Sequence, residues 1–188
     1  MAGVSAASAL SKLKAGNKRY VADKMKRERQ DPDRRDGLTG GQSPFAIVLS
    51  CADSRVVPEM VFDSGLGELF VVRVAGNVAN TSSIASIEYA VAHLGTKLIV
   101  VLGHESCGAV SAAMGGGDNG YNLNHLLAHI APAMSSVRGK ATVEKVVKQN
   151  AKVNAKELEA RSSIIDKAKG LKIVPAYYNL DGGKVEFL

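Results

Sequence analysis

Apolar residues follow two kinds of spacing along this chain, and the two kinds alternate. Short continuous apolar runs favour strands that are buried on both faces, and they occur at residues 45–50, 69–74, 98–102 and 171–178. Helices are predicted where apolar residues recur every three or four positions or where a proline can occupy a first helical turn, at residues 7–25, 58–63, 82–94, 109–114, 121–137 and 142–168. Strands that alternate with helices predict an α/β fold with a mainly parallel central sheet flanked by helices.

One domain is predicted for the whole chain, residues 1–188, because this length suits a single sizeable core. Residues 1–43 are predicted to form an N-terminal helical arm that ends in a polar, glycine-containing loop at 31–43. Residues 44–188 are predicted to form the α/β core with the C-terminal helices and strand. A turn is predicted at Asp181-Gly182-Gly183, before the last apolar segment at 184–188.

The composition is that of a soluble globular protein, with 46% hydrophobic and 22% charged residues. No apolar stretch is long enough for a membrane span or for a signal peptide, so we expect a cytoplasmic protein unless a targeting peptide has been removed. The net charge of +6 raises the question of nucleic-acid binding. However, the densest basic run, within residues 24–35, is interleaved with acidic residues, which favours a solvated arm and no nucleic-acid partner.

The two cysteines and one histidine each lie close to the end of a predicted buried strand. Cys51 opens the motif CADSR after the first strand, and His104 and Cys107 lie in GHESCG after the third. Ligands gather at the carboxyl ends of parallel strands, so we expect the three side chains to meet there. Two thiolates and an imidazole give three ligands for a tetrahedral zinc and leave a fourth position for water, which is typical of a catalytic site.

Two other interpretations of the cysteines remain. Buried cysteines often act only as small hydrophobic residues, and paired thiols can be redox-active, although the usual C-x-x-C spacing is absent here. The sequence His104-Glu105-Ser106-Cys107 is not a metalloprotease motif, because no second histidine follows at the required spacing.

The sequence closely resembles the β-class carbonic anhydrases from about Leu13 to the C-terminus. Four motifs carry the resemblance, and they are CADSR (51–55), GELFVVRVAGN (67–77), SIEYAVAHLG (86–95) and GHESCGAV (103–110). The resemblance implies one Zn²⁺ per subunit on Cys51, His104 and Cys107, and a carbonate dehydratase, a lyase that reversibly hydrates carbon dioxide to bicarbonate and a proton through zinc-bound hydroxide. It also implies a four-stranded parallel core with a further strand, and a helical arm that clasps a partner in a homodimer or a dimer of dimers.

The resemblance assigns roles to two residues beside the ligands. Asp53 is expected to accept a hydrogen bond from the zinc-bound water or hydroxide. Arg55 is expected to hold that carboxylate in a bidentate fork. Without the fork, Asp53 could become a fourth zinc ligand and close the site. Taken alone, the two residues could equally be a turn aspartate beside a surface arginine.

Further residues fall at the spacings that the plant-type members of the family use for the substrate pocket. Gln42 lies nine residues before Cys51, Phe70 lies nineteen after it, and Tyr89 lies fifteen before His104. The resemblance implies that Gln42 donates a hydrogen bond to the substrate and that Phe70 and Tyr89 line the pocket, with residues from both subunits contributing. Gly108 is a further candidate, because its amide could face the substrate, and Gly103 and Gly108 are expected to permit a tight turn at the metal.

A second branch of the family carries a tryptophan three residues before the first cysteine, in a bicarbonate site that inhibits the enzyme. This chain has Val48 at that position and contains no tryptophan. We therefore expect the plant-type, non-allosteric behaviour. Two alternative functions remain, namely hydrolysis of carbonyl sulfide or carbon disulfide by the same chemistry, and a non-catalytic zinc-binding scaffold.

Overall fold

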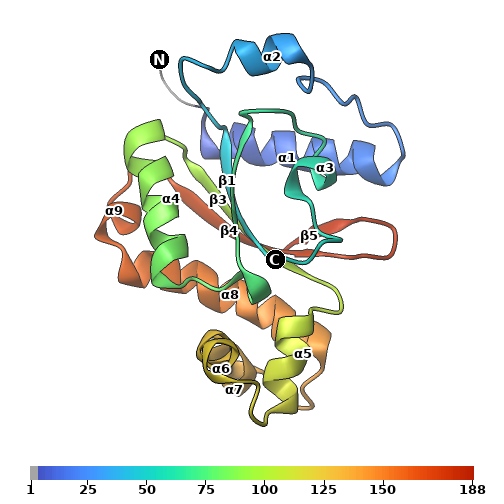
Figure 1. The fold of residues 1–188 in the computed structure, drawn as a ribbon, viewed down its shortest axis with the longest axis vertical. Coiled ribbons are helices and arrows are strands. Elements are labelled where there is room, and N and C mark those ends of the chain that lie inside the picture. Colours follow the sequence, from blue (N-terminus) through green and yellow to red (C-terminus); the bar gives the residue numbers. More distant parts are fainter. Residues whose placement is uncertain (1–3) are drawn as a thin grey trace.

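The computed structural model describes residues 4–188, and a five-stranded sheet runs through its centre (Figure 1). The strand order is β2-β1-β3-β4-β5, and the bounds are β1 Ala46–Ser50, β2 Leu69–Arg73, β3 Leu98–His104, β4 Lys172–Tyr178 and β5 Val185–Phe187. The first four strands are parallel, and β5 pairs antiparallel with β4. The predicted α/β fold with a mainly parallel sheet is confirmed.

The two central strands, β1 and β3, are buried along their whole length. Their continuous apolar sequences suit this position, because helices cover both faces of a parallel sheet. β2 lies at an edge and is only half-buried, although its sequence, Leu-Phe-Val-Val-Arg, is also apolar. An exposed apolar edge strand is a surface that another chain can pair with or cover.

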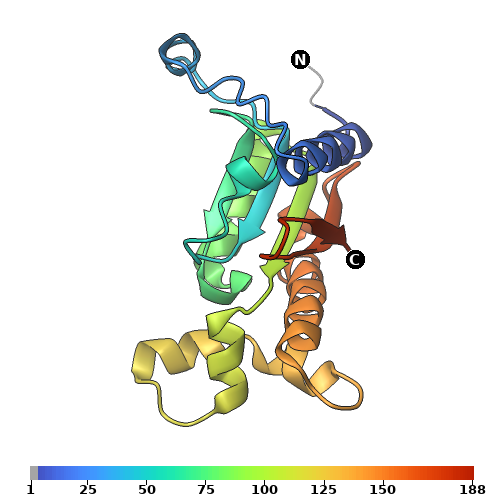
Figure 2. The same ribbon diagram turned by 90° about the vertical axis from the view of Figure 1, so that its right-hand side faces the viewer.

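Helices pack against both faces of the sheet (Figures 1 and 2). One face is covered by α1 (Ala6–Val21) and the short α3 (Pro58–Val61). The other face is covered by α4 (Thr81–Leu94), α8 (Val143–Arg161) and α9 (Ser163–Asp166). A group formed by α5 (Gly108–Gly115), α6 (Tyr121–Ala128) and α7 (Ala131–Ser136) extends beyond the end of the sheet at which α5 begins.

The N-terminal helix is anchored on the sheet of its own chain. Leu13 is fully buried, and Asn17 bonds three backbone groups of other segments. The Asn17 amide donates to the carbonyls of Val61 (3.1 Å) and Gly183 (2.9 Å), and its oxygen accepts from the amide of Val185 (2.9 Å). These bonds join α1 to α3 and to the C-terminal hairpin, so α1 is part of the core of this chain.

Three predicted boundaries were wrong, each for a local reason. The predicted loop at 31–43 contains a short helix, α2 (Pro32–Asp36), because the Asp31 carboxylate caps the amide of Arg34 at 2.8 Å. The predicted helix at 121–137 is broken into α6 and α7, where Pro132 occupies the first turn of α7. The predicted helix at 142–168 ends at Arg161, and Ser162 then caps α9. Within residues 4–188, no helix combines the length and the apolar character that crossing a membrane requires.

Candidate metal centre

The ligating atoms of Cys51, His104 and Cys107 all lie within 4.8 Å of one another. Cys51 directly follows β1, His104 is the last residue of β3, and Cys107 precedes the first turn of α5. Since β1 and β3 are parallel neighbours, their carboxyl ends deliver both motifs to one place. All three side chains are buried. The predicted meeting of the three residues is therefore present in the structure.

The turn between His104 and Cys107 requires a left-handed backbone at Ser106, where φ is 53°. The expected role of the two glycines in this turn was wrong. Gly103 instead permits close packing, because a Cβ there would lie 2.7 Å from a side-chain carbon of Val147 on α8. A Cβ on Gly108 would meet no atom within 4 Å, and its φ is not positive.

His104 presents one ring nitrogen toward the two sulfur atoms. Its Nδ1 lies 2.8 Å from the carbonyl oxygen of Glu105, so Nδ1 carries the proton and donates it in a hydrogen bond. In this tautomer Nε2 has a free lone pair. Within residues 4–188, this fully buried Nε2 has no hydrogen-bond partner. A buried polar atom without a partner is costly, and a metal ion bound to Nε2 would remove that cost. The residues present therefore fit a zinc ion.

Backbone amides surround both sulfur atoms. The Gly76 amide donates to Cys51 Sγ at 3.3 Å, and hydrogen bonds, above all one from the Cys107 thiol, hold the pKa of Cys51 well below its usual range. The same hydrogen bond and burial raise the pKa of Cys107, although the Ala109 and Val110 amides at the start of α5 oppose the rise. A divalent cation bound to both sulfurs would favour ionisation of both thiols.

Asp53 and Arg55 form the predicted fork. Arg55 Nε donates to one carboxylate oxygen of Asp53 at 2.9 Å, and Nη2 donates to the other at 2.8 Å. These hydrogen bonds hold the pKa of Asp53 well below its usual range, so the carboxylate is ionised at neutral pH. Asp53 Oδ2 lies 3.9 Å from His104 Nε2. The carboxylate is therefore next to the position that a bound metal would occupy.

Two other residues at the centre were not singled out from the sequence. Asn150 on α8 donates to the Gly76 carbonyl at 2.8 Å, and so holds the residue whose own amide bonds the sulfur of Cys51. Arg73, the last residue of β2, donates to the backbone carbonyls of Cys51 and Asp53. Both lie far from the two motifs in sequence. Arg73 and the 3₁₀ helix η1 (Ala75–Asn77) do lie within the motif GELFVVRVAGN (67–77). This motif was the only feature of the sequence that could have indicated their importance.

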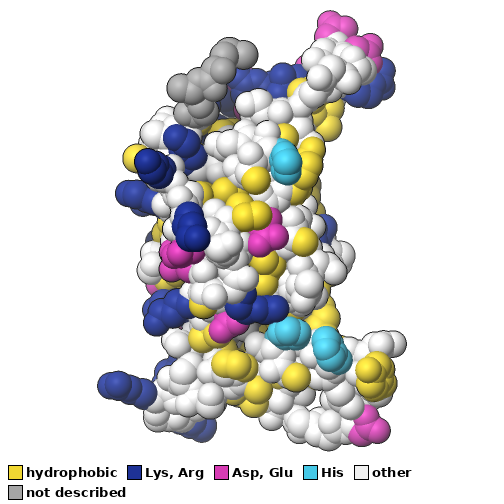
Figure 3. Space-filling view, turned by 90° about the vertical axis from the view of Figure 1, so that its left-hand side faces the viewer, with side chains coloured by type: hydrophobic (Ala, Val, Ile, Leu, Met, Phe, Trp, Pro, Cys, Tyr) yellow, Lys and Arg dark blue, Asp and Glu magenta, His cyan; other side chains and the backbone are white. Residues whose placement is uncertain are grey.

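The predicted pocket residues do not all lie at the metal ligands in a single chain. The rings of Phe70 and Tyr89 lie 6.3 Å apart, and Tyr89 is half exposed on α4. Hydrophobic side chains are also visible at the surface of the face shown in Figure 3. Phe70 pairs in register with Ile47, four residues before Cys51, which is about 13 Å along a strand. Gln42 is exposed in the loop that enters β1, at the opposite end of the sheet from α5 (Figure 1). Within one chain, the structure therefore does not bring all three residues to the centre at Cys51.

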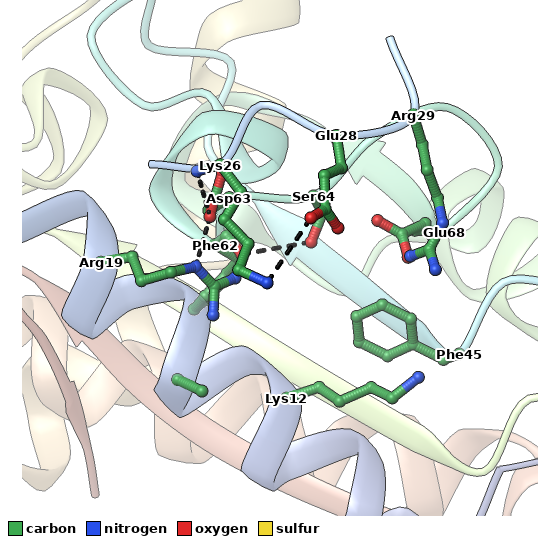
Figure 4. A pocket seen from close by; sticks show the side chains of 11 residues that line it. Lys12, Arg19, Lys26, Glu28, Arg29, Phe45, Phe62, Asp63, Ser64 and Glu68 are labelled. Carbon is green, nitrogen blue, oxygen red and sulfur yellow. Dashed lines mark hydrogen bonds and ion pairs between the residues drawn. The ribbon is translucent and has the colours of Figure 1, made fainter. Parts of the chain in front are cut away.

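A cavity of about 270 Å³ lies apart from these ligands, between α1, α3 and the segment that follows α1 (Figure 4). Its basic side chains face acidic ones: Arg19 pairs with Asp63, and Arg29 pairs with Glu68. The Asp63 carboxylate also accepts the amides of Lys26 and Arg27 at 3.0 and 3.1 Å. These ion pairs and hydrogen bonds hold the segment after α1 in place, and the cavity does not resemble the centre at Cys51.

The fold and the centre together define an α/β protein with a metal site of two cysteines and one histidine, which is a donor set of catalytic zinc sites. The family model described as Carbonic anhydrase matches residues 46–185. The chain is 41% identical over 181 residues to Carbonic anhydrase 2 of Mycobacterium tuberculosis, covering 92% of this chain and 87% of that protein. It is 40% identical over 185 residues to a carbonic anhydrase of Mycolicibacterium smegmatis, covering 93% and 89%.

Solved structures agree with these sequence matches. A β-carbonic anhydrase of Sordaria macrospora, described as tetrameric, superposes with a TM-score of 0.75 at 25% identity and covers 93% of each chain. The Coccomyxa β-carbonic anhydrase in complex with acetazolamide gives a TM-score of 0.74 at 27% identity, covering 81% of this chain and 75% of that one. The chain belongs to the β-carbonic anhydrase family, which is a family of enzymes.

Proposed function

We propose that this protein catalyses the zinc-dependent, reversible hydration of carbon dioxide to bicarbonate and a proton. One observation carries the proposal: the buried donors of Cys51, His104 and Cys107 converge beside a carboxylate that Arg55 holds in place. Three protein donors leave one tetrahedral position for a reacting water, whereas a purely structural zinc site would use four. This difference favours catalysis over a scaffold role.

Each residue of the centre has a separate role in the proposed reaction. A zinc ion on these donors would supply a hydroxide nucleophile by lowering the pKa of its bound water. Asp53, ionised and fixed by Arg55, would accept a hydrogen bond from the O–H group of that nucleophile and so orient the lone pair of the nucleophilic oxygen toward the carbon of the substrate. The Gly76 amide stabilises the Cys51 thiolate, and the Glu105 carbonyl keeps His104 in the tautomer that a metal requires.

The substrate pocket is proposed to form between two subunits. Phe70 and Tyr89 would give an apolar wall for carbon dioxide, and Gln42 would donate a hydrogen bond to one of its oxygens. Two observations support a second subunit at this place, namely the half-exposed Tyr89 and the apolar edge strand β2. A homodimer, alone or paired into a tetramer, would bring these residues to the centre of the opposite subunit.

Stopped-flow hydration of carbon dioxide near pH 8.5 tests the proposal. Zinc-loaded protein is expected to turn over rapidly, and the same protein stripped by a chelator is expected to be inactive until zinc is restored. Parallel assays with carbonyl sulfide and carbon disulfide distinguish the sister hydrolases. Absence of hydration in protein that holds one zinc per chain would refute the proposed reaction.

Activity is expected to rise with pH and to be highest under alkaline conditions. The thiolates of Cys51 and Cys107 place two negative charges beside the reacting water, and these oppose its ionisation more than neutral imidazoles would. The low pKa of Asp53 keeps that carboxylate charged over the whole range assayed. The measurement is a pH–rate profile of kcat from pH 6.5 to 9.5. A profile that reaches its plateau below pH 7 would contradict this expectation.

Replacing Tyr89 by glutamate is expected to dissociate the oligomer and abolish most hydration activity, because the new charge would be buried at the subunit contact. Analytical ultracentrifugation gives the mass of the particle, and stopped-flow gives the rate. The matched control is Tyr121→Glu, since Tyr121 is 86% exposed on α6. A Tyr89→Glu protein with the wild-type mass and rate would show that this surface is not the contact.

A further inference from the structure

Arg73 makes two hydrogen bonds to the backbone of the CADSR turn. Its Nε donates to the carbonyl of Cys51 at 3.0 Å, and its Nη2 donates to the carbonyl of Asp53 at 2.7 Å. One guanidinium group therefore holds both the residue that supplies a metal-binding sulfur and the residue that supplies the neighbouring carboxylate. Arg55 acts differently, because it binds the Asp53 side chain.

The position of Arg73 in the sheet explains why a side chain is needed here. The ladder between β1 and β2 ends at the pair Ser50 and Arg73, and Val74 adds one last amide bond to the Ser50 carbonyl at 3.1 Å. The chain after β2 then turns into η1, where the Gly76 amide bonds the sulfur of Cys51. The backbone after β2 therefore no longer pairs with the CADSR turn. The Arg73 side chain donates instead to the carbonyls of that turn.

The geometry requires a guanidinium group and not merely a positive charge. Nε and Nη2 belong to one rigid plane, so two hydrogen bonds from them fix two carbonyls relative to each other. A lysine ammonium is a single flexible point and cannot impose that relation. We infer that Arg73 is a positioning residue that sets the main chain of Asp53 relative to Cys51, while Arg55 sets its side chain. Asp53 is thus held by two arginines, one for each part of the residue.

Two variants and one control test this role. Arg73→Lys keeps the positive charge and most of the aliphatic side chain but removes the paired guanidinium donors. Arg73→Gln removes both the charge and the paired donors. The control is Arg161→Lys, because Arg161 also donates to a backbone carbonyl, that of Ala79, at 2.6 Å. All proteins are stripped and loaded with Co²⁺ for absorption spectra, and are loaded with Zn²⁺ for stopped-flow assays and thermal melts.

Arg73→Lys is expected to bind Co²⁺ with thiolate-to-cobalt absorption but with shifted visible d–d bands, because Cys51 is displaced relative to Asp53. Its kcat for hydration is expected to fall about 10- to 100-fold, the usual cost of losing a residue that orients metal-site groups, with little change in KM. Arg161→Lys is expected to lose thermal stability only, with the wild-type spectrum and kcat. If Arg73→Gln does not fold, the results for Arg73→Lys alone test the positioning role.

A wild-type cobalt spectrum and kcat in Arg73→Lys would overturn the inference, and so would equal changes in Arg73→Lys and Arg161→Lys. The kinetic result rests on the proposed hydration of carbon dioxide, but the spectrum does not. If the wild-type protein proved inactive, a shifted spectrum confined to Arg73→Lys would still support the positioning role, and an unshifted one would still refute it.

Discussion

Replacing Cys107 by serine is expected to abolish zinc binding and hydration while leaving the fold intact. The hydroxyl oxygen is a far poorer zinc donor than a thiolate, and only two protein ligands would remain. Serine is nevertheless well suited to the position, because Cys107 is the N-cap of α5 and serine is a preferred N-cap residue. Loss of the metal should lower the rate by at least about 1,000-fold, because the zinc ion would supply the hydroxide nucleophile by lowering the pKa of its bound water.

Metal content and thermal melts separate this result from simple unfolding. Wild-type protein should melt at a higher temperature with zinc than with a chelator, because a ligand that binds the native state stabilises it. Cys107→Ser should melt at one temperature under both conditions, close to that of the stripped wild-type protein. One zinc per chain together with full turnover in Cys107→Ser would show that Cys107 is not a ligand.

The convergence of the three candidate ligands could be predicted from the sequence because its geometry follows from simple rules. Cys51 and His104 lie at the ends of two apolar runs, and parallel neighbouring strands bring such ends together. Asp53 and Arg55 are two residues apart, so their contact is nearly local. The fold class followed from the same alternation of strands and helices.

Other parts of the centre could not be predicted in this way, because they depend on long-range packing. Asn150 reaches Gly76 only because α8, which packs on one face of the sheet, also contacts η1. Arg73 bonds Cys51 only because β2 lies beside β1, and the sequence does not state the strand order. The separation of Gln42 from the metal ligands follows from strand polarity, since Gln42 precedes β1 and Cys51 follows it. Counting residues between motifs cannot show on which subunit a residue acts.

Replacing Asp53 by asparagine is expected to retain zinc but to reduce kcat for hydration by about 100- to 1,000-fold, within the range for a residue that handles a proton at the reacting group. The ionised carboxylate accepts two hydrogen bonds from the Arg55 side chain and one from the Arg55 backbone amide, and it can accept another from the nucleophile. An amide has one acceptor oxygen, and its NH₂ group must face either Arg55 or the nucleophile, both of which are donors. The size of the side chain is unchanged, so packing is not the cause.

The matched control is Asp63→Asn. Burial raises the pKa of Asp63, but hydrogen bonds from Arg19 and from two backbone amides outweigh it, so the carboxylate is ionised and ion-paired as Asp53 is. Asp63 lies in the cavity of Figure 4, away from the ligands. Asp63→Asn should therefore lower the melting temperature and leave kcat unchanged. Asp53→Asn should instead lower kcat and change the melting temperature little. Wild-type kcat in a zinc-loaded Asp53→Asn protein would remove Asp53 from the mechanism, and the Arg55 fork would then be only a structural contact.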